Sequence, residues 1–234
     1  MSPEVIIDKP EELPAVLVRR LEALAVEALR DRNRFAVALP GGSVATAFLP
    51  AFARAGVDWN RTDFFWGDER AVPPEHPDSN YGVAWSLWLK DAGLPPSRIH
   101  RMPADAADLE AAARDYESVL VERLGPSPAL DVVLMGMGPD GHICSLFPGH
   151  PLLEENERLV AAILDSPKAP PRRLTLTLPA LAAARLLVVA AFGEAKAPVL
   201  REALHDPRSP LPVAMALRRA SRALVLLDPA AAGR

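Results

Sequence analysis

Short, almost uninterrupted apolar runs alternate along the chain with longer segments in which hydrophobic residues recur every three to four positions. The longer pattern is typical of an amphipathic helix, and the short one is typical of a strand that is buried on both faces. Helices are therefore predicted at residues 11–30, 43–52, 81–90, 109–124 and 193–204. Strands are predicted at residues 35–39, 62–66, 131–135, 185–192 and 223–227, with weaker candidates at 159–164 and 173–178.

This alternation determines the expected fold class. Strands that alternate with helices of ten or more residues form βαβ units, and these build a mostly parallel sheet with helices on both faces. We therefore expect an α/β fold in three layers. No internal repeat and no linker interrupts the pattern, so residues 1–234 are expected to form a single domain.

Residues that could bind a ligand or take part in catalysis follow directly after three of the predicted strands. These segments are Pro40-Gly-Gly-Ser43, Gly67-Asp-Glu-Arg70 and the glycine-rich stretch from Gly136 to His142. In open α/β sheets, ligands bind beyond the carboxyl ends of the strands. The three segments are therefore expected to meet in one site.

Composition and charge exclude several classes of protein. Half of the residues are hydrophobic and 24% are charged, which excludes a disordered chain. Lys and Arg total 26 against 30 Asp and Glu, so the formal charge of −4 argues against a nucleic-acid partner. The longest apolar candidate, residues 186–192, is too short to span a membrane, and no basic segment leads into an apolar one at the N-terminus. We therefore expect a cytoplasmic protein with no membrane partner.

The segment Gly41-Gly42-Ser43 fits a phosphate site. Glycines let the backbone approach a ligand closely, and a helix capped by Ser43 would direct free N–H groups and a positive dipole towards an anion. The same residues are also compatible with a tight turn and an ordinary N-cap. No Gly-Lys-[Ser/Thr] sequence follows, so this is not a Walker loop.

Two further strand ends carry candidate catalytic residues. Asp140 and His142 bracket a glycine turn, and a histidine titrating near neutral pH is the natural general base. Asp68 could orient such a base, and Arg70 could hold an anionic oxygen. Each segment also has a simpler interpretation, as a polar surface loop or a solvated ion pair.

Lys196 is a candidate phosphate ligand, because a lysine in the first turn of a helix opposes the helix dipole and a bound anion would compensate it. Arg172 and Arg173 are similar candidates. The single cysteine, Cys144, is either a small buried residue or a thiol nucleophile. No H-x-x-x-H or H-E-x-x-H motif is present, so no metal site is predicted.

Five segments, in order along the chain, resemble those of the glucosamine-6-phosphate isomerase/6-phosphogluconolactonase superfamily, and within it the lactonases. They are Leu39-Pro-Gly-Gly-Ser43, the stretch from Trp66 to Tyr81, the stretch from Gly136 to Gly149, Arg173-Leu-Thr-Leu-Thr177 and Gly193-Glu-Ala-Lys196. The resemblance implies a Rossmann-like fold and hydrolysis of 6-phospho-D-glucono-1,5-lactone to 6-phospho-D-gluconate in the oxidative pentose phosphate pathway. It also implies a small sugar-phosphate lactone as partner, with no metal and no cofactor, and we expect a monomer.

The resemblance also implies a role for each candidate residue. His142 is the expected base that activates water, with Asp140 and Asp68 as polar members of the site and Arg70 holding the substrate. The substrate phosphate is expected at Gly41, Gly42, Ser43, Lys196 and Arg173.

The deaminases of the same superfamily are the main alternative. Their Asp-Gly-His segment continues to a glutamate that serves the histidine, where this chain has Phe147, and they carry Asp-Glu-Tyr where this chain has Asp68-Glu69-Arg70. Cys144 departs from the lactonase pattern, in which alanine is common at that place. A sugar-phosphate-sensing regulator would usually carry a DNA-binding module, and no helix-turn-helix extension or basic patch is visible.

Overall fold

The computed structural model describes residues 2–234, and its centre is a six-stranded sheet in the order β1-β9-β8-β5-β2-β3. All neighbouring strands of this sheet run parallel. A second, antiparallel sheet has the order β4-β7-β6. The strands are β1 (Glu4–Ile7), β2 (Phe35–Leu39), β3 (Thr62–Trp66), β4 (Asp68–Arg70), β5 (Val132–Gly136), β6 (Val160–Ile163), β7 (Arg173–Leu176), β8 (Leu187–Ala191) and β9 (Ala223–Leu227).

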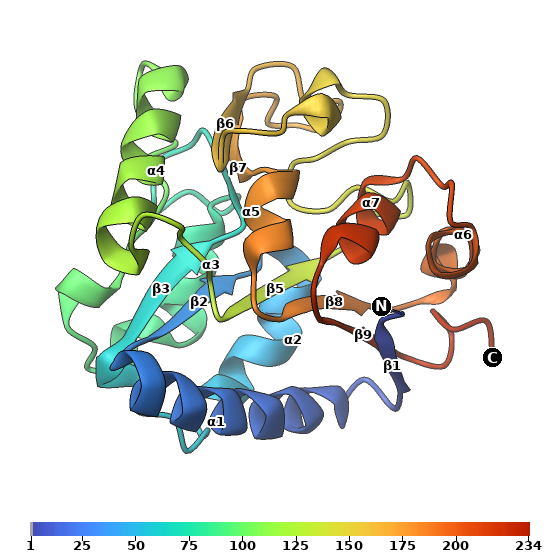
Figure 1. Ribbon diagram of the computed structural model, residues 1–234, viewed down its shortest axis with the longest axis horizontal. Coiled ribbons are helices and arrows are strands. Elements are labelled where there is room, and N and C mark those ends of the chain that lie inside the picture. The colour runs from blue at the N-terminus through green and yellow to red at the C-terminus, as the bar shows by residue number, and fades with distance from the viewer. Residues whose placement is uncertain (1) are drawn as a thin grey trace.

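Helices cover both faces of the parallel sheet, which confirms the predicted α/β architecture. α1 and α2 lie on one side of it, and α4, α5 and α7 lie on the other (Figure 1). The α-helices are α1 (Leu13–Arg32), α2 (Gly42–Phe52), α3 (Asn80–Leu87), α4 (Leu109–Leu124), α5 (Leu178–Ala183), α6 (Ala197–His205) and α7 (Pro212–Arg219). Among residues 2–234, no helix combines the length and the apolar character that a bilayer crossing requires.

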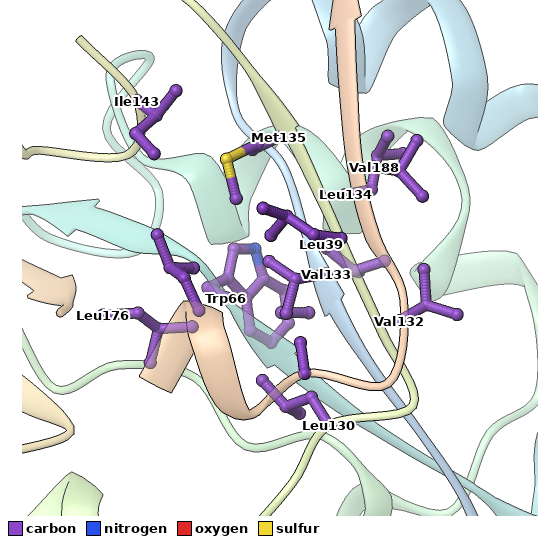
Figure 2. Close-up of a cluster of buried hydrophobic side chains, with 14 of the residues drawn as sticks. Leu39, Trp66, Leu130, Val132, Val133, Leu134, Met135, Ile143, Leu176 and Val188 are labelled. Carbon is purple, nitrogen blue, oxygen red and sulfur yellow. The ribbon is translucent and has the colours of Figure 1, made fainter. Parts of the chain in front are cut away.

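The core forms because the central strands present apolar side chains to both helical layers. Every residue of β2 and of β8 is buried, as expected for parallel strands covered on both faces. Leu39 of β2, Trp66 of β3 and Val133 of β5 gather in one cluster (Figure 2). This packing fixes the strand ends from which the polar segments emerge.

Several elements differ from the sequence prediction. The charged residues Asp68–Arg70 form β4, which pairs with β7 and opens the second sheet directly after β3. Strand β1 and the helices α5 and α7 were not predicted. Strand β1 has only four residues, at the sheet edge, and α5 has only six, so neither shows a clear periodicity. The strands at residues 35–39, 62–66 and 223–227 and the helix at 109–124 are confirmed to the residue.

Two predicted helix starts are wrong. Helix α2 begins at Gly42 with Gly41 as its N-cap, so Ser43 is not the cap and no side chain takes that role. A 3-10 turn, Glu194–Lys196, precedes α6, which begins only at Ala197. Pro198 lies in the first turn of α6, where a missing N–H has no cost. Lys196 therefore precedes this helix instead of lying in its first turn.

Candidate active site

A polar cavity of about 260 Å³ lies beyond the carboxyl ends of β2, β3, β5 and β8. It brings together the three strand-end segments that the sequence singled out. The candidate residues that line it are Gly41, Gly42, Ser43, Asp68, Arg70, His142, Arg173 and Lys196. Cys144 and Asn80 line it as well. Asp140 and Arg172 do not line the cavity, and Asp140 reaches the site through His142.

The glycine turn after β2 has a backbone that other residues would not allow. A Cβ at Gly41 would lie 1.9 Å from Asn80 Oδ1, and Gly42 has a φ of +60°. Position 41 therefore has no room for a side chain. At position 42 the backbone is in a left-handed conformation, which glycine adopts without strain. Gly41, Gly42 and Ser43 line the cavity at the start of α2, and no side chain caps the first N–H groups of this helix.

Asp140 and His142 form a close pair after β5. Asp140 Oδ1 lies 2.5 Å from His142 Nδ1. A Cβ at Gly138 would lie 2.0 Å from that same nitrogen, so the pair exists only because position 138 is glycine. Gly141, with a φ of +83°, makes the tight turn between the two side chains. The ring of Phe147 stacks on the imidazole with centroids 4.9 Å apart.

The structure answers which carboxylate partners His142, a point that the sequence left open. Asp68 is buried and accepts hydrogen bonds from Ser145 Oγ at 2.6 Å and Asn80 Nδ2 at 3.1 Å. Of these two carboxylates, Asp140 is the one that bonds to the imidazole. Asp68 is therefore a buried negative charge in the cavity wall, and Asp140 is the direct partner.

Lys168 joins this pair, although no motif or periodicity in the sequence pointed to it. Its Nζ lies 3.0 Å from Asp140 Oδ2 and 3.0 Å from His142 Nδ1. Burial alone would raise the pKa of Asp140, but hydrogen bonds from His142 and Lys168 outweigh it and hold this pKa at about 2. Burial lowers the pKa of His142, assisted by the Lys168 charge, and outweighs the opposing effect of Asp140. At neutral pH the site therefore holds an ionised Asp140 beside a neutral His142.

Glu69 and Arg70 are neighbours in β4, but their side chains contact different partners. Arg70 Nη1 donates to the carbonyl of Asp78 at 2.7 Å, and its buried Nε has no partner among residues 2–234. Glu69 accepts hydrogen bonds from the backbone N–H groups of Arg70, Asn80 and Tyr81. Burial raises the pKa of Glu69 despite these bonds. Arg70 thus contributes charge to the cavity, and Glu69 holds the loop that leads into α3.

Of the two adjacent arginines, Arg173 faces the cavity. It is buried, and its guanidinium donates to the carbonyls of Lys168, Ala169 and Pro170 at 2.9, 3.1 and 2.9 Å. The exposed Arg172 instead donates to the carbonyl of Ala107. Arg173 therefore holds the loop between β6 and β7 while adding positive potential to the cavity wall.

Lys196 reaches across the site towards the end of β5. Its Nζ donates to the carbonyl of Met137 at 2.8 Å. Burial lowers the pKa of Lys196, and the neighbouring Lys168 charge acts in the same direction. An anion in the cavity would relieve both effects, because it favours the charged ammonium.

Cys144 is partly buried at the cavity wall, and it fits the interpretation as a small packed residue better than that of a nucleophile. Burial raises the pKa of its thiol well above the ordinary value, so the reactive thiolate is disfavoured. Within residues 2–234, no three His, Cys, Asp or Glu side chains gather in a way that could hold a metal ion.

Comparison with known proteins identifies the family. The sequence model described as glucosamine-6-phosphate isomerases/6-phosphogluconolactonase matches residues 8–225. The chain belongs to this family. The resemblance that five sequence segments predicted is thereby confirmed.

Curated relatives within the family carry the lactonase name. The 6-phosphogluconolactonase of Rattus norvegicus is 42% identical over 97% of this chain and 91% of its own length. The 6-phosphogluconolactonase of Streptomyces coelicolor is 39% identical over 99% of this chain and 94% of its own length. These relatives confirm the expectation of an enzyme of the 6-phosphogluconolactonase type.

A solved structure supports the fold. The 6-phosphogluconolactonase from Trypanosoma cruzi superposes with a TM-score of 0.88 at 27% identity, covering 100% of this chain and 98% of its own. The predicted Rossmann-like, mostly parallel α/β fold is therefore confirmed as the fold of this family.

Proposed function

We propose that this protein hydrolyses 6-phospho-D-glucono-1,5-lactone to 6-phospho-D-gluconate without a metal ion, with His142 as the general base. One observation carries this proposal. The Asp140–His142 pair opens onto the same cavity as the glycine turn and Lys196. A base and an anion site on one small cavity match a substrate that has both an ester carbonyl and a phosphate.

The phosphate end of the substrate is assigned to the glycine turn and Lys196. The N–H groups of Gly42 and Ser43 open helix α2, where backbone donors and the helix dipole favour an anion. Lys196 supplies a formal positive charge from the segment that follows β8, at the same edge of the sheet. Arg173 adds to the positive potential, although most of its donors hold backbone carbonyls. Phosphate binding would position the lactone ring and lower the entropic barrier to attack.

The base is prepared by its environment. With the Nδ1 proton directed to Asp140, the other ring nitrogen, Nε2, carries the lone pair and has no hydrogen-bond partner among residues 2–234. His142 lines the cavity, so a water molecule held there could transfer a proton to Nε2 as its oxygen attacks C1 of the lactone. A lactone carbonyl is an activated ester, and no covalent nucleophile is required.

The remaining charges serve the intermediate and the leaving group. Attack places a negative charge on the carbonyl oxygen, and Arg70 or loop N–H groups would stabilise this oxyanion. The C1–O bond of the ring then breaks, and the ring oxygen takes the proton back from the His142 imidazolium. This returns the base to its neutral form, as the next turnover requires.

The deaminase alternative finds no support at His142. The side chain that packs on the imidazole is the aromatic ring of Phe147, and the carboxylate at its Nδ1 belongs to Asp140. The site thus lacks the second carboxylate that the deaminase pattern places after the Asp-Gly-His segment. The monomeric state and the cytoplasmic location remain predictions.

The test is the rate of lactone disappearance, with the lactone generated in situ and EDTA present. The lactone also opens spontaneously, so the reaction without protein sets the background. Acceleration well above this background, with no release of ammonia from glucosamine 6-phosphate, is expected. Lactone loss at the background rate would contradict the proposal, and activity that disappears in EDTA and returns with zinc would overturn its metal-free part.

A further inference from the structure

Lys168 lies at the Nδ1 edge of the His142 ring. Its Nζ is 3.0 Å from His142 Nδ1 and 3.0 Å from Asp140 Oδ2, and Lys168 is not among the cavity-lining residues. We propose that Lys168 is a positioning residue that keeps His142 neutral and its Nδ1–H directed to Asp140. The inference deepens the proposed function, because it concerns the residue assigned there as the base.

The position of Lys168 is built into the fold. The buried Arg173 donates to the carbonyl of Lys168 at 2.9 Å, and Ser166 Oγ donates to the same carbonyl at 2.9 Å. The N–H of Lys168 donates in return to Ser166 Oγ at 3.2 Å. The Lys168 backbone is therefore fixed from both sides, unlike that of an ordinary surface lysine. Its side chain, which is half exposed, has only to bridge to Asp140.

Lys168 affects which ring nitrogen of His142 carries the proton. An ammonium only donates and a carboxylate only accepts, so the two neighbours of Nδ1 favour opposite tautomers. Lys168 can donate to Asp140 Oδ2, which leaves Oδ1 to accept the Nδ1 proton. The Asp140 carboxylate then bridges the ammonium and the imidazole, and Nε2 keeps its lone pair for the reaction.

The closeness of Lys168 to Nδ1 also disfavours a positive charge on the His142 ring. An ammonium 3.0 Å from Nδ1 repels the imidazolium, so it lowers the pKa of His142 and makes the protonated ring a stronger acid. This favours a neutral base before attack and an easy return of the proton to the leaving ring oxygen. Asp140 limits the effect, since its charge stabilises the imidazolium at 2.5 Å.

The other groups that face His142 do not replace Lys168 in this role. Asp140 from the same loop and Asp68 from β4 are both negative and raise the pKa of the ring. Phe147 covers one face of the ring, and the apolar residues Val199 and Leu211 border the turn at Gly141. The remaining charges on the cavity wall are the cations Arg70, Arg173 and Lys196. Lys168 is the cation whose Nζ lies 3.0 Å from both members of the pair.

The test is the ¹⁵N NMR titration of the His142 imidazole in the wild type and in Lys168→Met, Lys168→Arg and Lys90→Met. Loss of the Lys168 charge is expected to raise the pKa of His142 by about 1 unit, and Lys168→Arg to keep it near the wild-type value. Lys90→Met removes the same charge from an exposed site in another part of the molecule and is expected to change nothing. The acidic limb of kcat/KM should move to higher pH together with the titration in Lys168→Met.

A folded Lys168→Met whose His142 titrates at the wild-type pH would overturn the inference. So would an equal loss of activity at all pH values without a shifted limb, because that is the result of a merely structural role. Lys168→Gln, which keeps a polar side chain of similar length, provides a second variant if the methionine disturbs the loop. If the wild type fails to hydrolyse the lactone, the proposed function fails alone, since the titration still decides the role of Lys168.

Discussion

Single residues in this site are distinguished by their partners more than by their type. Asp68 and Glu69 are adjacent carboxylates, yet Glu69 accepts backbone N–H groups while Asp68 faces the cavity. The sequence could place candidates at strand ends, because ligand sites in this fold class lie there. It could not reveal Lys168, which reaches Asp140 and His142 from a proline-rich loop without periodicity.

The role of Lys196 can be separated from that of the base by kinetics. In the proposed role, Lys196 binds the substrate phosphate equally in the ground state and the transition state, so Lys196→Ala should raise KM about 10- to 100-fold with kcat nearly unchanged. Steady-state kinetics on the lactone measures both constants, and Lys9→Ala is a matched exposed control. A collapse of kcat at constant KM would show that Lys196 acts in the chemical step instead.

Whole elements were predictable where hydrophobic spacing is strong. Strands β2, β3 and β9 and helix α4 match their predicted ranges because their burial follows directly from apolar periodicity. Strand β4 was not predictable in this way, since its three residues are all charged and it forms only by pairing with β7, far away in sequence. Local pattern carries no information about such distant pairing.

The loop between β4 and α3 is expected to depend on Glu69. Glu69→Ala leaves three backbone N–H groups and the Ser79 hydroxyl without their acceptor in a buried place, which should lower the free energy of unfolding by about 3 kcal/mol. Chemical denaturation measures this value, and Glu75→Ala is an exposed control in the same loop. A loss no larger than that of the control would mean that the loop is held by other contacts.

At the scale of the whole molecule, ionic contacts tie the parallel sheet to its covering segments. Asp63 of β3 bonds to Arg98 and His100 in the following segment and to Arg123 of α4. Burial alone would raise the pKa of Asp63, but the hydrogen bonds of His100 and Arg123 and the charge of Arg98 outweigh it and lower this pKa. The parallel architecture was predictable from the sequence, whereas this cross-connection was not, because its members are far apart in the chain.

A depressed pKa in the folded state makes stability depend on pH in a definite direction. The contribution of Asp63 is fully present above its unfolded pKa, about 3.9, and is lost as pH falls through the lower folded value. Asp63→Asn should lower the free energy of unfolding by about 2 kcal/mol at pH 7. Between pH 5 and 3, the variant should then lose less stability than the wild type. Urea unfolding across this range measures the free energy of unfolding of the wild type and of the variant. Parallel curves of this free energy against pH would contradict the role assigned to Asp63.

The central claim is that His142 takes the proton from water, and His142→Ala tests it most directly. The measurement is kcat for lactone hydrolysis in EDTA, corrected for spontaneous opening, alongside circular dichroism of both proteins. The account predicts a loss of about two or more decades in kcat with an unchanged fold. A folded variant with activity close to that of the wild type would contradict it and remove His142 from the mechanism.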